Sequence, residues 1–269
     1  MSVDPFLDAL AHGARVFDLG RELFHGMPQS LNHPPFRMAL QRRHGDHIRP
    51  DGGSAANEMI VTGGHVGTHI DALSHVSHEG VLHGGVDADA VQKGGRFSEL
   101  GIETVAPIVC RGVLLDVPKA LGLEACEPGY EVTSDDLDAA LNGVSLGAGE
   151  VALVRTGWGK LWSDREAYIG KESGVPGPGE EGAKWLASFG LLAAGADSIA
   201  FEHLPPGAGH AVLPAHRVLL VDHGIHIIET MALEELAASG VKEFLFVLSP
   251  LKLVGATGSP ARPLAIVAS

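Results

Sequence analysis

Length, composition and charge limit what this chain can be. With 269 residues and 45% apolar content, it can bury the core of one large domain or of two small ones. Its 33 acidic and 19 basic residues give a formal charge of −14, which disfavours nucleic acid and anionic membrane as partners. No apolar run reaches the roughly 20 residues that span a bilayer, and no secretory leader is recognisable. We therefore expect a cytoplasmic protein in which Cys110 and Cys126 stay reduced.

Strand and helix signals alternate irregularly along the chain. Thr133 is expected to cap a helix whose first turn is acidic and whose inner face is apolar. The segment 180–189 has helical spacing and should end at Gly190. We further expect a helix at 233–239 and strands at residues 16–19, 36–41, 58–62, 108–117, 151–156, 244–248 and 264–267. This pattern predicts an α/β or α+β fold with a mixed sheet, in a single domain over residues 1–269.

The most informative segment is residues 63–75, with the sequence GGHVGTHIDALSH. Its residues His65, His69, Asp71 and His75 carry lone pairs suited to a divalent metal, and all four fall at odd positions. In an extended chain their side chains would point to one side, whereas a helix would turn Asp71 away from the two histidines before it. Two imidazoles and a carboxylate bind Zn(II), Mn(II) or Fe(II) and leave positions open for water and substrate. We predict a strand that runs into a loop and holds a metal.

The alternative for this segment is chance proximity on a solvated loop, since the chain contains 15 histidines. Four convergent ligand-type residues among small, flexible ones favour the metal site. A turn-rich loop at residues 26–35, which contains His33, lies upstream. It is either a surface connection or a lid over the site.

A second informative segment covers residues 216–229. It predicts a short apolar helix ended by Gly224 and then a strand that ends in Glu229. Burying a carboxylate at the end of an apolar strand is unfavourable unless a positive group receives it, and a metal would do so. His216, at the start of the preceding element, could converge on the same place or lie on the surface. Glu229 and His216 are therefore further candidate ligands.

Residues 65–75 resemble the signature motif of a known family. The run His65-Val66-Gly67-Thr68-His69-Ile70-Asp71, with His75 four residues further on, resembles the H-x-G-T-H-x-D-x-x-x-H signature of the metal-dependent cyclase superfamily, which includes bacterial kynurenine formamidase and isatin hydrolase. Residues 156–159, 216–229 and 255–260 are similar to the longer-chain members, so the resemblance covers nearly the whole sequence. Formamidases carry a proline at the position of Leu73 and a tryptophan in the entry loop, which corresponds here to residues 26–35 and contains no tryptophan. The closer likeness is therefore to the branch that contains isatin hydrolase.

The resemblance implies a fold, an assembly and roles for residues. The fold would be the swivelling β/β/α type, and the protein would be a homodimer or homotetramer. The metal would be held by His65, His69, Asp71 and Glu229, and His75 would act as proton shuttle. By the same resemblance, His216 would lie near or on the metal and could serve a second ion.

A hydrolytic mechanism also follows from the chemistry of these groups. A divalent ion, Mn or Zn, held by His65, His69 and Asp71 would lower the pKa of a bound water to about 7 and so produce hydroxide at neutral pH. His75, whose imidazole ordinarily titrates near neutrality, could take the water's proton and return it to the leaving nitrogen. Glu229 would complete the metal shell or orient the water.

We therefore predict a metal-dependent amidohydrolase that acts on a small molecule. It would cleave the carbon–nitrogen bond of a small amide, a cyclic imide or lactam, or an aryl formamide. Two other functions fit the same residues. A non-haem Fe(II) oxygenase would use His69, Asp71 and His216, and a non-catalytic metal-binding or sensing module would need no turnover at all.

Overall fold

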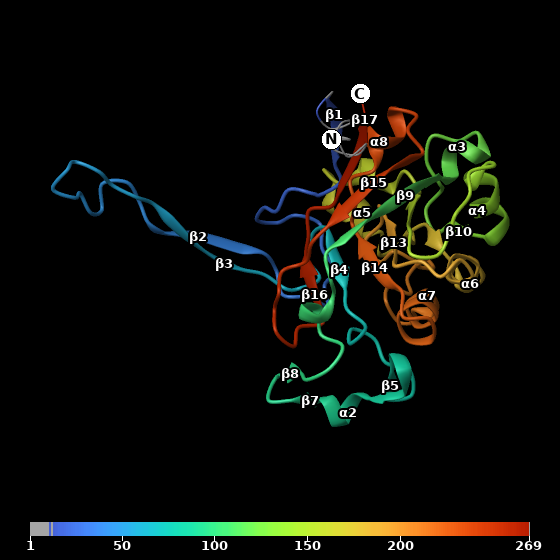
Figure 1. The fold of residues 1–269 in the computed structure, drawn as a ribbon, viewed down its shortest axis with the longest axis horizontal. Helices are drawn as coiled ribbons and strands as arrows, with labels where there is room; N and C mark the ends of the chain where they lie inside the picture. Colours follow the sequence, from blue (N-terminus) through green and yellow to red (C-terminus); the bar gives the residue numbers. More distant parts are fainter. Residues whose placement is uncertain (1–10, 12, 269) are drawn as a thin grey trace, which may run out of the picture.

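A nine-stranded mixed sheet organises the computed structural model, which describes residues 11 and 13–268 (Figure 1). Its order is β1-β17-β15-β9-β11-β13-β14-β4-β16. The strands are β1 (Ala14–Asp18), β4 (His69–Asp71), β9 (Ile108–Asp116), β11 (Val151–Arg155), β13 (Ala193–Ala196), β14 (His226–Glu229), β15 (Glu243–Leu248), β16 (Gly258–Pro260) and β17 (Leu264–Ala268). Because β1 pairs with β17, strands from both ends of the described chain meet at one edge.

Four parallel strands form the centre of this sheet. β9, β11, β13 and β14 run in the same direction, and antiparallel strands flank them on both sides. β4 pairs antiparallel with β14, in a register that sets His69 opposite Glu229. The carboxyl end of a central strand and the start of β4 therefore meet at one point. Neighbouring strands in a sheet lie about 4.8 Å apart, so the two side chains are held close together by backbone pairing.

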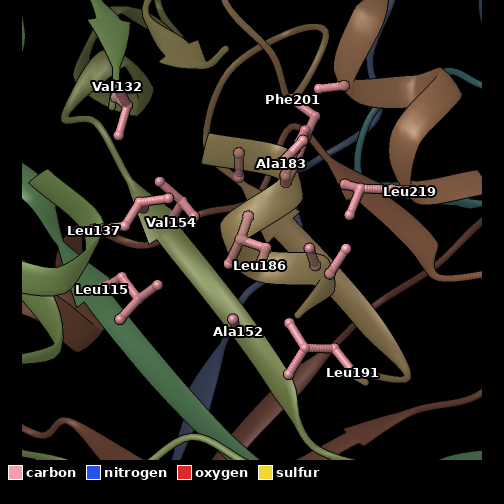
Figure 2. Packing of buried hydrophobic residues seen from close by; sticks show 14 of the residues in the cluster. Leu115, Val132, Leu137, Ala152, Val154, Ala183, Leu186, Leu191, Phe201 and Leu219 are labelled. Carbon is pink, nitrogen blue, oxygen red and sulfur yellow. The ribbon is translucent and has the colours of Figure 1, made fainter. Parts of the chain in front are cut away.

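Helices lie on both faces of the main sheet and in the segments around it. They are α2 (Ala88–Val91), α3 (Val117–Leu121), α4 (Ser134–Leu141), α5 (Arg165–Ile169), α6 (Glu180–Ala187), α7 (Pro214–His216) and α8 (Glu234–Ala238), with 3-10 turns at His83–Gly85, Ile102–Thr104 and Trp158–Leu161 and a π-helical segment at Arg217–Asp222. Leu137 of α4 and Leu186 of α6 pack against β9 and β11 in one buried cluster (Figure 2). Leu236 of α8 belongs to a second cluster, with Leu114 and Leu153 of the same two strands. Successive residues of these strands point to opposite faces of the sheet, so each face has its own hydrophobic core.

Four small sheets lie outside the main one. They pair β2 (Arg37–Arg42) with β3 (Asn57–Val61), β5 (Val81–Leu82) with β6 (Val86–Asp87), β7 (Gln92–Lys93) with β8 (Arg96–Phe97), and β10 (Glu131–Val132) with β12 (Gly177–Pro178). The β2–β3 hairpin extends far from the body of the molecule (Figure 1). Within the described residues, no helix is long and apolar enough to cross a membrane.

The predicted mixed α/β sheet is confirmed, and most predicted elements are found within two residues of their expected bounds. The Thr133 cap is present as a capping box with Asp136. Two features of the structure differ from what the sequence predicted. β13, with the sequence AAGA, was not predicted because its small residues carry no alternating pattern. The segment predicted to bind a metal is extended over His69–Asp71 and is turn-like on both sides, so alternation along one strand does not account for the position of His65.

Candidate metal centre

His65, His69 and Asp71 meet at the end of β4. One potential ligand atom from each lies within 4.8 Å of the other two, and all three residues are buried. The Nδ1 atom of His65 lies 2.7 Å from Oδ1 of Asp71, and Nε2 of His69 lies 3.5 Å from the same oxygen. Nδ1 of His69 donates to the carbonyl of Gly67 at 2.7 Å, which leaves Nε2 of His69 facing the carboxylates. The structure therefore brings together the three residues predicted as the core of the site.

Glycines allow the close backbone approach that places His65. A Cβ at Gly64 would lie 2.8 Å from the carbonyl oxygen of Gly258, and a Cβ at Gly258 would lie 2.5 Å from the His65 ring. Gly67 has a φ of +68°, which a side chain rarely adopts. Thr257, beside Gly258, places its hydroxyl 2.9 Å from Nε2 of His65. A turn, rather than an extended strand, thus sets the His65 ring against Asp71.

Glu229 and His216 lie at the same point, as the second sequence segment predicted. Glu229 ends β14, and its oxygens lie 3.3 Å from Nε2 of His69 and 3.2 Å from Nε2 of His216. His216 ends α7 and reaches to 3.7 Å from Oδ2 of Asp71. Both side chains are buried, so His216 is not the surface residue that the sequence left as an alternative.

His75 joins a second group of potential ligands. Atoms of Asp71, His75 and His216 lie within 4.8 Å of one another, so two groups share the Asp71 carboxylate. The ring of His75 stacks on that of His65, with centroids 3.9 Å apart and planes 25° apart. His75 is therefore a member of the second group and also stacks on His65, a member of the first. This arrangement offers room for one ion or two.

Glu202 is a buried site residue that the sequence analysis missed. It accepts hydrogen bonds from the backbone N–H groups of Ala215 and His216, and from Nδ1 of His216 at 2.6 Å. Such a carboxylate fixes the histidine tautomer so that Nε2 is free for a metal. Glu202 is fully buried in a largely apolar segment, so the reasoning applied to Glu229 would also have selected it.

The charges at this point suit a divalent cation. Oδ2 of Asp71 is buried without a hydrogen-bond partner. Burial opposes protonation of His69, but the hydrogen bond that His69 donates to Glu229 and the charge of Asp71 outweigh it and raise the pKa of His69 to about 9. Burial also opposes protonation of His216, but its hydrogen bonds to Glu202 and Glu229 outweigh burial and raise the pKa of His216 to about 10. The buried carboxylates therefore keep these two imidazoles protonated. A bound metal ion would replace the positive charge of those protons.

Two other histidines near this point are neutral. Burial lowers the pKa of His75 to about 3, although Asp71 opposes the shift. Burial also lowers the pKa of His33 to about 4, and its ring stacks on His65 with centroids 5.1 Å apart. The His75 value lies below the near-neutral titration expected from its residue type. Its imidazole is therefore unprotonated at pH 7.

A cavity of about 180 Å³ opens onto the histidines and Glu229. The entry loop supplies one wall, which confirms that residues 26–35 lie over the site rather than forming a plain surface connection. Val76, Ile199 and Leu213 supply apolar surface, and His210 lies at the same wall. The remaining lining residues are Pro28, Gln29, Ser30, Asn32, His33, His65, Gly67, His69, His75, His216, Glu229 and Thr230. A volume of this size suits a small, partly apolar molecule.

Comparison with known proteins bears on this centre. A family model described as Putative cyclase matches residues 17–203, which include the predicted signature. Isatin hydrolase from Roseibium aggregatum is 30% identical over 223 residues, which cover 81% of this chain and 77% of that protein.

Solved structures give the same result for the fold. The crystal structure of a novel cyclase has a TM-score of 0.84 at 29% identity, and covers 98% of this chain and 93% of that one. An isatin hydrolase bound to the product analogue thioisatinate has a TM-score of 0.76 at 24% identity, with 100% of both chains covered. The predicted resemblance is confirmed, and this chain belongs to the putative cyclase family.

Proposed function

We propose that this protein hydrolyses the carbon–nitrogen bond of a small cyclic amide or imide, or of an aryl formamide. The class of enzyme, a metal-dependent amidohydrolase, follows from the family match and from the isatin hydrolase relative. The observation that carries the finer proposal is the convergence of His65, His69, Asp71 and Glu229 at the inner end of a small cavity. Such a centre keeps its ligands buried and still admits a substrate.

The residues present fit a divalent ion, Mn or Zn. His65, His69, Asp71 and Glu229 would hold it, and His216 would either join them or hold a second ion together with His75. When bound, the ion would acidify water and polarise the substrate carbonyl. The cavity walls would orient the substrate so that its carbonyl carbon faces the ligand cluster. Val76, Ile199 and Leu213 would contact its apolar part and exclude bulk water.

We assign proton transfer to His75. Its Asp71 and His65 neighbours hold the ring against the centre, and its lowered pKa leaves the imidazole unprotonated at pH 7. It would accept a proton during attack on the carbonyl carbon and return a proton to the nitrogen as the carbon–nitrogen bond breaks. A neutral imidazole can perform both steps within one turnover, whereas one that is already protonated cannot accept the first proton.

The finer predictions of assembly and compartment belong to the same proposal. A homodimer or homotetramer and a cytoplasmic location stay predictions, and the physiological substrate is a small molecule of the classes named above. Isatin is the first compound to test, because the isatin hydrolase of Roseibium aggregatum is 30% identical to this chain.

Metal analysis followed by a substrate screen tests the proposal. Protein purified without added ions should contain bound Mn or Zn and should hydrolyse at least one compound among isatin, N-formylkynurenine, cyclic imides and simple lactones. His78→Ala is the matched control, because His78 is exposed and lies outside the cavity lining. Dioxygen consumption that depends on His69, Asp71 and His216 would favour the oxygenase. Stoichiometric metal with no hydrolysis in the whole screen would favour the non-catalytic module.

A further inference from the structure

Thr68 lies inside the signature segment but is not one of its candidate ligands. It directly precedes His69 and is buried. Its hydroxyl donates to the carbonyl oxygen of Thr230 at 2.7 Å and accepts the backbone N–H of Arg21 at 2.9 Å. Thr230 directly follows Glu229 in the chain. One hydroxyl therefore joins the residue before His69 to the residue after Glu229.

This hydrogen bond lies where the pairing of β4 with β14 ends. The last pair of that register sets His69 opposite Glu229, and the next would set Thr68 opposite Thr230. The backbone carbonyl oxygen of Thr68 accepts a hydrogen bond at 2.9 Å from Ala261, which follows β16 on the other side of β4. At this position, the connection from β4 to the chain after β14 is therefore made by the side chain of Thr68.

Thr230 adopts a backbone conformation that is unfavourable for its residue type. Its φ is +58°, in the left-handed region, where a β-branched side chain crowds the backbone. A residue keeps such a conformation only when its surroundings over-determine it. The N–H of Thr230 donates to the carbonyl of Ser198 at 3.0 Å, and the next N–H, of Met231, donates to that of Ala196 at 3.0 Å. The hydroxyl of Thr68 supplies a third restraint, from a side chain.

The turn at Thr230 affects the position of Glu229. β14 ends at Glu229, and the chain turns at the next residue. A change of φ at Thr230 must move either the chain after it or the end of β14. The chain after it is held, because the carbonyl of Met231 accepts a hydrogen bond from the guanidinium of Arg21 at 3.1 Å. Part of the movement would therefore fall on Glu229, whose oxygens lie 3.3 Å and 3.2 Å from two histidines of the centre.

Arg21 also fixes the direction of the Thr68 hydroxyl. A hydroxyl donates one proton, and its oxygen can accept a hydrogen bond at the same time. Because the backbone N–H of Arg21 points at that oxygen, the hydroxyl proton is directed to the carbonyl of Thr230. The guanidinium of the same arginine donates to Met231. Arg21 therefore contacts both segments that the hydroxyl joins.

We propose that Thr68 is a positioning residue of the metal centre. Its hydroxyl holds Thr230 in the left-handed conformation and so keeps Glu229 in place opposite His69. Thr68 does not line the cavity, and it acts through Glu229 without touching the substrate. The inference adds a residue to the proposed function and rests on it in one respect, which is that Glu229 faces the metal.

Exchange of Thr68 for valine and for serine tests the hydroxyl. Thr68→Val keeps the shape of the side chain and removes the hydroxyl, whereas Thr68→Ser retains it. In competition titrations against a chelator, run with Zn(II) and with Mn(II), Thr68→Val should bind about 10- to 100-fold more weakly, the usual effect of losing a residue that orients a metal ligand. Thr68→Ser should bind as tightly as the unmodified protein.

Thr133→Val is the matched control, because it removes a hydroxyl by the same exchange. The Thr133 hydroxyl caps α4 and belongs to no part of the centre. This variant should unfold at a lower urea concentration than the unmodified protein, with unchanged metal affinity. Urea unfolding of the metal-free Thr68 variants, measured beside it, separates loss of stability from loss of metal binding.

Thr230→Gly tests whether Thr68 acts through the conformation of residue 230. Glycine adopts the left-handed conformation without strain, so it needs less restraint there. Removal of the Thr68 hydroxyl should therefore weaken metal binding less in Thr230→Gly than in the unmodified chain. An equal loss in both backgrounds overturns the inference. So does a Thr68→Val variant that keeps full affinity, or a Thr68→Ser variant that binds no better than Thr68→Val.

Two further outcomes are also decisive. Should Thr68→Val misfold by circular dichroism, Thr68→Cys takes its place, since a thiol is only a weak donor, and it must bind metal more weakly than Thr68→Ser. A chain that shows these differences in affinity but hydrolyses nothing supports the inference and counts against the proposed function alone. A chain that binds neither Zn(II) nor Mn(II) overturns both.

Discussion

Glu202 accepts two hydrogen bonds from His216 and one from the neighbouring Ala215, and the shortest joins Oε1 of Glu202 to Nδ1 of His216 at 2.6 Å. Two of the three donors are backbone N–H groups, at Ala215 and at His216 itself. The carboxylate therefore fixes the position of the main chain, the ring orientation and the tautomer at once. Nε2 of His216 is left to face Asp71 and Glu229.

Glu202→Gln should weaken metal binding by about 10- to 100-fold, the usual effect of losing a carboxylate that orients a metal-binding histidine. The amide can still accept a hydrogen bond from Nδ1 of His216, but a neutral acceptor raises the basicity of the metal-facing Nε2 less than a carboxylate does. The measurement is a competition titration of the purified protein with a metal chelator. Glu181→Gln, at an exposed helix position, is the control. Unchanged affinity in Glu202→Gln would mean that His216 does not bind the metal.

Single alanine variants of His65, His69 and Asp71 should each lose most of the bound metal and nearly all activity. An open site depends on few protein ligands, so the loss of one removes a large share of the affinity. Metal content per chain, measured by elemental analysis, tests this, with His78→Ala as the exposed control. Full metal content in any of the three variants would remove that residue from the ligand set.

His75→Ala should keep most of the metal and lower kcat by about 10²- to 10⁴-fold, the span for loss of a positioned acid or base. The pH profile of kcat should also lose one limb, because the remaining ionisation would belong to the centre itself. Metal content and kcat must be measured on the same preparation. Loss of metal would instead make His75 a ligand of a second ion with Asp71 and His216, and near-normal turnover would pass the shuttle role to another residue.

Asp197→Asn should destabilise the fold by about 1–3 kcal/mol for each donor left without its carboxylate partner. Asp197 is fully buried and accepts hydrogen bonds from the backbone and hydroxyl of Thr156 and from the N–H of Gly157. The asparagine amide would turn an N–H₂ group toward at least one of these donors. Urea unfolding measures the change, with the exposed Asp138→Asn as control. Equal stability of the two variants would show that this network contributes little.

The sequence could predict which residues form the candidate metal centre because their chemistry is local. The spacing of His65, His69 and Asp71 identifies ligand-type residues without any knowledge of the fold, and an acidic residue at the end of an apolar strand singled out Glu229. The reason given for their convergence was wrong in part. A turn allowed by Gly64 and Gly258 aims the His65 ring, and the contact between those two glycines joins distant segments that no local pattern connects.

Other features were beyond the sequence for a different physical reason. β13 is central to the sheet but consists of alanine and glycine, because a Cβ at Gly195 would lie 2.6 Å from the sulfur of Met231. Such a strand is specified by its neighbours and not by its own propensity. Glu202 itself could have been selected as a carboxylate in an apolar segment, but its pairing with His216, which lies in a separate element, depends on the tertiary fold.

The register that sets His69 opposite Glu229 also bears on the order of folding. These residues are far apart in the sequence, and the parallel strands β9, β11 and β13 lie between β4 and β14 in chain order. Long-range pairing of this kind forms late, because loop closure must precede it. The nascent chain therefore cannot use the ion as a template, and metal uptake should follow sheet closure. Capture of the ion would then report that folding is complete.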